Sequence, residues 1–427
     1  MRRHVRFWLS TSLCFLSSVL IADLSNQDSV SILDVSADPG AVNITTGTGD
    51  LGRLFKLGKD SPLRIGGLLT SDGDCILSGG TKQGALSGNN LLILSLLFDT
   101  EKASFWKNGL FGAEFLQFNG MDSNGRAGSV QGFDGLCTQS PWNRSELYQL
   151  WFRQTFFDSK LAVRIGKMAA TIDFNNVLRP TLITSKAPSA PSLSGLLFTP
   201  IFLNPVNLGV MPGYLDTAYG VMARATPIKD FYISAGFYDG NQARGKRTGL
   251  EGPHFNGYYF TIAETGVSWD FGPSHKPGIM AIGAWNQTGD LSIPEIVQQK
   301  GAQGVYLFGS QRVWFRNPGQ DYSGVSMYWQ AGHNNAPTLP MNDYFGLGFS
   351  AYALTRPRDS FGVGMAFSKI NKRLGTRPDE LMFQGYYQTH LFFNTYLQPV
   401  VSYIPTPAGG VQLPQTWVAT LQMISLF

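Results

Sequence analysis

Apolar and polar residues alternate in short segments along most of the chain. In KLAVRIGKM (160–168) Leu161, Val163 and Ile165 are aliphatic, and the residues that follow each of them are small or charged. FYISAGFYD (231–239) repeats this pattern, with aromatic and aliphatic residues on one face and small or hydroxyl-bearing residues on the other. Successive side chains of a β-strand point to opposite faces, so each segment predicts a strand with one apolar face.

The chain contains about sixteen such segments, which Gly, Pro, Asn or Asp usually close. We predict strands at 63–70, 91–99, 110–118, 147–157, 160–167, 219–226, 231–238, 259–270, 278–288, 303–315, 323–332, 345–354, 361–370, 381–392, 395–404 and 416–427. Helical patterning is confined to the N-terminal stretch, where residues 49–59 predict a short helix.

The connections between these strands alternate between long and short. Residues 71–90, 119–146, 168–218 and 239–258 are long connections, and residues 100–109, 158–159 and 227–230 are short ones. A soluble β-sandwich also alternates apolar and polar residues, but it has no reason to keep this order of loops. Short periplasmic turns and long external loops are typical of outer-membrane barrels, so we predict an all-β fold, a transmembrane antiparallel β-barrel of about sixteen strands.

The longest connection, 168–218, is rich in proline and in apolar residues. A loop of this length and composition is not expected to extend freely into water. We expect it to fold into the lumen and to constrict the pore; a lid packed over the mouth of the barrel is the alternative.

Both ends of the chain carry targeting signals. Arg2, Arg3 and Arg6 precede an apolar segment that ends near Ala22, which predicts a secretory signal peptide at 1–22. We expect an N-terminal periplasmic segment at 23–62 and the β-barrel at 63–427, with no later apolar run long enough for a spanning helix. The final strand ends at Phe427, which we expect to close the barrel against the first strand and to act as a signal for the outer-membrane assembly machinery.

Composition and charge exclude other classes. The 427 residues carry a net charge of +4 without a run of Lys or Arg, so nucleic-acid binding gains no support. The chain has neither a GxSxG nor an HExxH motif, and its histidines stand in no recognisable motif with a serine, so we expect no enzymatic activity and no cofactor. Outer-membrane lipid is the expected surrounding; the sequence leaves open a monomer or a homotrimer.

Two cysteines follow the predicted signal peptide, Cys75 and Cys137. Both fall in predicted external loops, so a disulfide between them is allowed after export to an oxidising compartment. No histidine stands near either cysteine, and two thiols alone do not make a zinc site. We therefore predict no metal site.

Three segments of the second half resemble a known family. They are GVYLFGSQRVWFR (304–316), YFGLGFSAYALTRPRDSFGVGMAFSKI (344–370) and LQPVVSYIPTPAGG (397–410); IGGLLTSDGDCILSGG (65–80) is similar more weakly. Together with the terminal Phe427 they resemble the carbohydrate-selective porins of the OprB type. The resemblance implies a single sixteen-stranded barrel that admits sugars by diffusion. Where the family commonly has a carboxylate before two tyrosines, this chain has Gln384, so a pore role for that acid is in doubt here.

Strand parity predicts which side chains face the lumen. Leu150 and Phe152 mark an apolar face, so their neighbours should point inward. The candidate pore-lining residues are Trp151, Arg153, Arg164, Arg224, Arg312, Gln388 and Glu114. Aromatic rings can stack on a pyranose, and Arg or Gln can bind its hydroxyl groups.

These predictions define an outer-membrane porin for the passive diffusion of small solutes, most of all sugars. The excess of arginine makes an anion- or phosphate-preferring or general pore the nearest alternative, and each arginine could instead brace the barrel wall in an ion pair. A surface adhesin that uses the external loops is a further alternative.

Overall fold

The computed structural model describes most of the chain after residue 49. The described residues are 50–58, 60–138, 143–175, 204, 206, 211–213, 216–242, 247–272, 276–292, 298–318, 323–356, 358–371, 373 and 377–427. The predicted signal peptide at 1–22 and most of the predicted segment at 23–62 lie outside them. Among the described residues no helix is long and apolar enough to cross a membrane.

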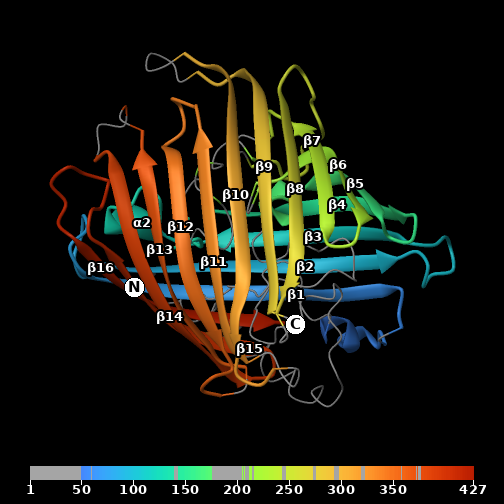
Figure 1. The fold of residues 1–427 in the computed structure, drawn as a ribbon, viewed down its shortest axis with the longest axis horizontal. Helices are drawn as coiled ribbons and strands as arrows, with labels where there is room; N and C mark the ends of the chain where they lie inside the picture. Colours follow the sequence, from blue (N-terminus) through green and yellow to red (C-terminus); the bar gives the residue numbers. More distant parts are fainter. Residues whose placement is uncertain are drawn as a thin grey trace, which may run out of the picture.

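Sixteen antiparallel strands form one closed barrel in which each strand pairs with its neighbours in sequence (Figure 1). The strands are β1 (Leu63–Ser78), β2 (Leu86–Asp99), β3 (Gly109–Asn119), β4 (Arg144–Phe156), β5 (Leu161–Met168), β6 (Ala218–Ile228), β7 (Phe231–Asp239), β8 (Tyr259–Phe271), β9 (Lys276–Asp290), β10 (Lys300–Phe315), β11 (Gly324–Asn334), β12 (Met341–Tyr352), β13 (Ser360–Ile370), β14 (Asp379–Phe392), β15 (Thr395–Ile404) and β16 (Thr416–Leu426). The predicted fold and strand count are confirmed.

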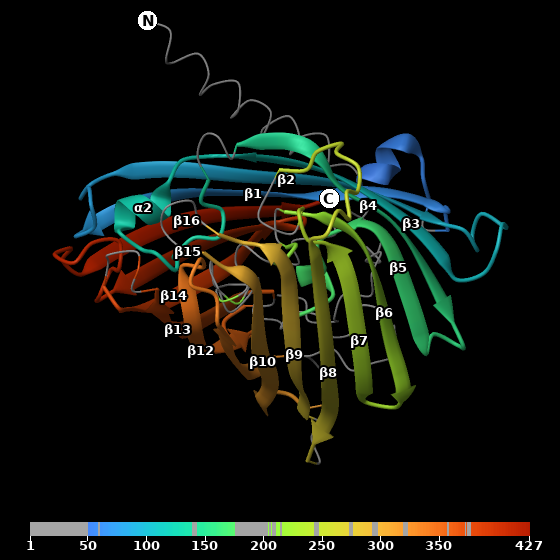
Figure 2. The same ribbon diagram turned by 90° about the horizontal axis from the view of Figure 1, so that it is seen from above.

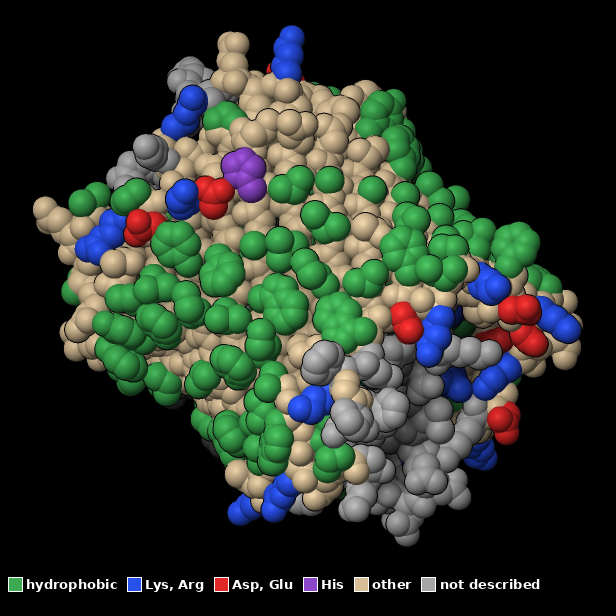
Figure 3. Space-filling view, in the orientation of Figure 1, with side chains coloured by type: hydrophobic (Ala, Val, Ile, Leu, Met, Phe, Trp, Pro, Cys, Tyr) green, Lys and Arg blue, Asp and Glu red, His purple; other side chains and the backbone are tan. Residues whose placement is uncertain are grey.

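Alternation separates the two faces of the wall as the sequence predicts. Large apolar side chains on one parity are exposed, as expected for the lipid face, among them Leu150, Ile165, Val221, Ile233, Ile282, Val305, Phe349, Val363, Val401 and Leu421. Their neighbours in each strand are buried. Figure 3 shows such apolar side chains as a broad band across one face of the barrel, with most of the charged side chains towards its borders.

The last strand closes the barrel against the first. Leu426 pairs with Leu68 of β1. The backbone of Phe427 continues this pairing, because its N–H donates to the carbonyl of Gly67 at 3.0 Å and its carbonyl accepts from the N–H of Gly67 at 2.6 Å. Gly67 fits this close pairing, since a Cβ at this position would lie 2.3 Å from the backbone carbonyl oxygen of Ile93 and 2.7 Å from the Phe427 ring.

The first external loop is shorter than predicted. The sequence places a loop at 71–90, but β1 runs to Ser78 and β2 begins at Leu86. Asp, Asn, Gly and Ser in this region resemble turn residues, yet Asp72, Asp74 and Asn89 are buried strand residues. A barrel with a polar interior places such residues on its inner face, and this explains the error.

Three short helices accompany the strands in the described part of the chain. A 3₁₀ helix, η2 (Asp50–Phe55), lies within the predicted helical stretch 49–59. The helix α2 (Ser123–Ala127) lies in the β3–β4 loop and contacts β1 and β16 (Figure 2). A second 3₁₀ helix, η3 (Ala170–Ile172), follows β5 and starts the long β5–β6 loop.

Candidate functional site

The β5–β6 loop is anchored to the inner wall directly after η3. The carboxylate of Asp173 forms an ion pair with Arg164 of β5. The ring of Phe174 is fully buried beside Gly236 of β7. The backbone N–H of Asn175 donates to Oε2 of Glu264 on β8 at 2.6 Å.

A later part of the same loop lies against a different part of the wall. Asn204 donates to the carbonyl of Ala331 on β11 at 3.0 Å, and the carbonyl of Val206 accepts from Asn334 at 2.8 Å. The described part of the loop therefore contacts β5 and β8 at one end and β11 at the other. These contacts agree with the predicted inward-folding loop and not with a lid outside the barrel; residues 176–203 lie outside the described residues.

Three arginines, one each from β4, β5 and β6, lie on the inner wall among carboxylates from β3, β8 and the β5–β6 loop. Arg153 lies opposite Arg164 in the β4–β5 pairing, and Arg224 stacks 3.7 Å from the ring centroid of Tyr232. Burial raises the pKa of Asp173, and the guanidinium groups of Arg164, Arg224 and Arg153 oppose this rise.

Two further carboxylates complete this arrangement. Glu264 accepts from the hydroxyl groups of Tyr232 at 2.8 Å and Tyr306 at 2.7 Å. Glu114 on β3 accepts from Gln149 at 2.6 Å and is buried. Glu114, Asp173 and Glu264 thus stand among the three arginines, and we refer to these six residues as the charged patch.

Trp151 borders the charged patch but is itself packed in protein. The guanidinium carbon of Arg164 lies 5.3 Å from the centroid of the indole ring. A Cβ at Gly112 of β3 would lie 2.3 Å from the same ring, so the indole lies against the backbone of β3. The expected stacking of a sugar on this ring is therefore not available in this arrangement, and the indole N–H is buried without a hydrogen-bond partner.

Several polar atoms around the charged patch lack partners. In the described part of the chain, buried side-chain atoms without a hydrogen-bond partner include Trp151 Nε1, Arg153 Nε, Arg164 Nε, Tyr238 OH, Ser234 Oγ and both amide atoms of Asn175. Unpaired buried polar groups are uncommon and call for water or a ligand. Arg153 is the only one of the predicted arginines that is half-buried; Arg164, Arg224 and Arg312 are buried.

Two predicted residues face inward but lie away from the charged patch. Arg312 of β10 is buried, and its guanidinium carbon lies 5.0 Å from the ring centroid of Phe315. Gln388 of β14 donates to Gln398 at 2.8 Å, and Gln398 donates to Gln422 at 3.4 Å. This row of glutamines ties β14, β15 and β16 together on the inner wall.

The disulfide between Cys75 and Cys137 is not formed; both cysteines are free. Cys75 lies in β1 with the parity of the lipid face, not in an external loop as predicted. Cys137 lies in the β3–β4 loop, where its thiol contacts Asp122 at 3.4 Å. Burial raises the pKa of the Cys137 thiol to about 12.

Sequence reasoning missed that the β3–β4 loop also folds inward. Glu380 of β14 accepts hydrogen bonds from Ser129 Oγ at 2.5 Å and from the N–H groups of Val130 at 2.9 Å and Gln131 at 3.2 Å. Gln384, where the family commonly has a carboxylate, donates to the carbonyl of Phe133 at 2.9 Å. Nothing in the loop sequence names these partners, because they lie about 250 residues away along the chain.

The RPRD turn after β12 is structural. Asp359 accepts from Tyr387 at 2.6 Å, from Thr389 at 3.1 Å and from the N–H of His390 at 3.1 Å, all on β14. The Asp359 carboxylate therefore ties this turn to β14.

A closed sixteen-stranded barrel with an apolar outer face and an inward-folded loop defines an outer-membrane porin. The model of the OprB family of carbohydrate-selective porins matches residues 85–427, and the chain belongs to this family. It is a non-enzymatic, carbohydrate-selective porin of the bacterial outer membrane.

Individual relatives agree with this assignment. Porin B of Pseudomonas aeruginosa is 22% identical over 387 residues, which cover 78% of this chain and 80% of the relative. The high-pH structure of Pseudomonas putida OprB has a TM-score of 0.72 at 17% identity and covers 86% of this chain and 94% of its own. The low-pH structure has a TM-score of 0.56 at 15% identity, with 88% and 96% covered. At these identities the two structures support the fold alone.

Proposed function

We propose that sugars in transit exchange water for the unpaired polar atoms beside the charged patch. Trp151 Nε1 and Arg153 Nε can donate to sugar hydroxyl groups, and Tyr238 OH and the amide of Asn175 can both donate and accept. These partnerless atoms next to the inward-folded loop carry the proposal. A pore ligand must be bound well enough to enter and weakly enough to leave, which a few neutral hydrogen bonds provide.

Charge balance favours a neutral solute over phosphate. Three arginines of the charged patch face three carboxylates, and Asp173 in particular is surrounded by Arg164, Arg224 and Arg153. An anion would have to displace these carboxylates or lie beside them, which is costly inside a protein. The anion-preferring pore suggested by the number of arginines is therefore the weaker alternative.

The remaining predictions concern maturation and assembly. We propose that residues 1–22 are removed on export, that residues 23–62 precede the barrel in the periplasm, and that Phe427 is read by the assembly machinery. The proposed sugar contacts all lie within one chain, so a homotrimer would leave them unchanged. Deletion of Phe427 should lower the amount of assembled barrel; normal assembly would contradict its role as a signal.

Single-channel conductance in a planar bilayer tests the solute class. We expect glucose or maltose, added to the KCl solution, to reduce the current through the refolded protein at concentrations at which phosphate has a smaller effect. Block by phosphate alone would overturn the proposal in favour of an anion pore. An absence of conductance from a folded barrel would also overturn it and would direct attention to the external loops.

A further inference from the structure

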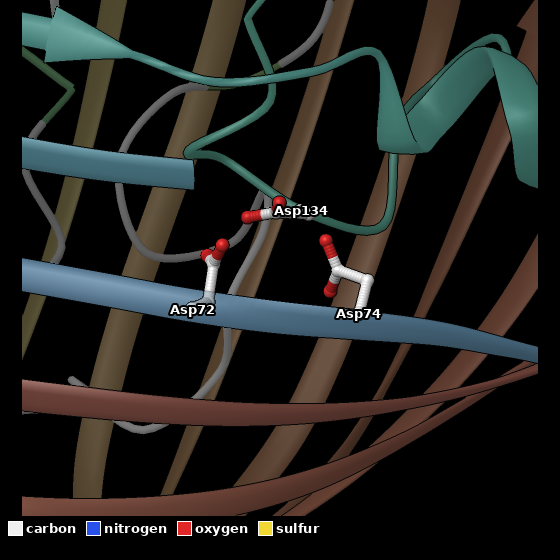
Figure 4. A group of neighbouring side chains, drawn as sticks. All are labelled: Asp72, Asp74 and Asp134. Atoms are coloured by element: carbon white, nitrogen blue, oxygen red, sulfur yellow. The ribbon is translucent and has the colours of Figure 1, made fainter. Parts of the chain in front are cut away.

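Three carboxylates meet on the inner wall away from the charged patch. Asp72 and Asp74 point inward from β1, and Asp134 comes from the β3–β4 loop (Figure 4). One oxygen from each lies within 4.8 Å of the others. All three residues are buried, with exposed fractions of 7%, 1% and 1%.

Neutral groups satisfy two of these carboxylates in part. Asp74 accepts from Thr420 at 2.6 Å. Asp134 accepts from Ser123 Oγ at 3.1 Å and from the N–H of Leu136 at 2.7 Å. The Asn89 amide donates to Asp134 at 3.3 Å and to Asp74 at 3.5 Å.

Asp72 has no such partner. Both of its carboxylate oxygens are buried without a hydrogen bond, and Figure 4 shows the group directed towards Asp134. Within the described residues, none of the three aspartates forms an ion pair with Lys, Arg or His. Buried charges are normally paired or coordinate a metal, so this arrangement requires either a cation or a proton shared between the carboxyl groups.

The ligand set favours calcium over magnesium. Three carboxylates meet here, with the amide of Asn89 and the hydroxyl group of Thr420 beside them. Ca²⁺ takes about six to eight oxygen ligands in a flexible geometry, whereas Mg²⁺ keeps several waters and is usually bound by only one or two carboxylates. Histidine and cysteine ligands are absent from this group of three, which disfavours zinc.

We propose that Asp72, Asp74 and Asp134 bind a calcium ion that fastens the β3–β4 loop to β1. The ion would neutralise two of the three charges and would hold Asp134, and with it the loop, against the wall. Glu380 holds an adjacent part of the same loop on β14 through hydrogen bonds alone. Calcium would therefore set how firmly one inward loop is attached, independently of the sugar contacts on β4–β8.

Calorimetric titration of the refolded, EDTA-treated protein in detergent tests the site. We expect CaCl₂ to bind with a dissociation constant on the order of 10⁻⁴ M or tighter, and more tightly than MgCl₂. Asp72→Asn should weaken calcium binding by at least about tenfold, since it replaces a charged carboxylate ligand with a neutral amide oxygen. Asp343→Asn is the control. It changes a partly exposed carboxylate of β12 that pairs with His333 of β11, and calcium binding should remain as in the wild type.

Thermal unfolding of the wild-type protein keeps the proposal testable if Asp72→Asn does not fold. The unfolding temperature should rise with each tenfold increase in free calcium, because a ligand of the native state stabilises it by mass action. The proposal is overturned if the titration with calcium shows no heat of binding and calcium leaves the unfolding temperature unchanged. It is also overturned if Asp72→Asn binds calcium as tightly as the wild type. The proposal is also overturned if Asp72→Asn is more stable than the wild type and its unfolding temperature does not change with calcium. That result would show that the carboxyl groups share a proton instead. None of these readouts depends on sugar transport.

Discussion

Two external loops fold into this barrel, and the wall holds them by different electrostatics. The β5–β6 loop is held on β5 and β8 by Asp173 and Asn175, where arginines and carboxylates balance one another. The β3–β4 loop is held on β14 and β1 by Glu380 and the aspartate group, where carboxylates meet no cationic side chain among the described residues. The first wall is therefore suited to a neutral polar solute, and the second to a cation.

The largest expected effect comes from breaking the ion pair under the β5–β6 loop. Arg164→Met leaves Asp173 buried without its ion-pair partner, and breaking a buried pair in this way costs about 3–5 kcal/mol. We expect the free energy of unfolding in detergent to fall by this amount, measured by denaturant titration. Arg316→Met is the control, because the Arg316 guanidinium donates to the carbonyl of Leu354 at an exposed site. An equal loss in both variants would contradict the anchoring role of Arg164.

A smaller loss of stability is expected where Glu380 of β14 holds the β3–β4 loop. Glu380→Gln retains one acceptor oxygen but loses the charge that strengthens the hydrogen bonds from Ser129, Val130 and Gln131. A hydrogen bond to a charged group contributes about 1.5–3 kcal/mol, so we expect a destabilisation of about this size. The conductance block by sugar should be unchanged. A loss of block in a folded Glu380→Gln barrel would show that the two loops are not independent.

The sequence predicts that Gln388 lines the pore and binds the solute, whereas in the structure it forms a hydrogen-bonded row with Gln398 and Gln422. Gln388→Met removes one neutral hydrogen bond to Gln398, which predicts a loss of about 0.5–1.5 kcal/mol in the free energy of unfolding. Since Gln388 lies on β14, away from the charged patch, we expect sugar block to stay as in the wild type. A clear change in block would return Gln388 to the solute path.

The sequence predicts the strands of the barrel wall better than the contacts of the loops that fold inside it. Strand parity needs only neighbouring residues, so the inward placement of Trp151 follows from the alternation. The closure at Phe427 is expected from the barrel as a whole, and the pairing of β16 with β1 confirms it. The partners of Asp173, Glu380 and Asp134 are brought together by the closed barrel and the folded loops, and no local pattern encodes them.

The two errors have the same physical origin. The segment with Asp72 and Asp74 resembles an external loop, because Asp, Gly and Ser are common turn residues. In a barrel with a polar lumen such residues belong to the inner face of a strand. The same misassignment places Cys75 in an external loop and so allows a disulfide with Cys137. It also gives no reason to expect Asp72 and Asp74 on the inner wall beside Asp134.

The central claim is that unpaired donors beside the charged patch bind sugar, and Trp151→Phe tests it most directly. This change keeps an aromatic ring beside Arg164 but removes the indole N–H, and one neutral hydrogen bond corresponds to roughly a threefold to tenfold change in affinity. Trp314→Phe is the matched control, because Trp314 is exposed on β10. We predict that maltose block of single-channel current weakens by this factor in Trp151→Phe and not in Trp314→Phe. Equal block in the wild type and both variants would contradict the account.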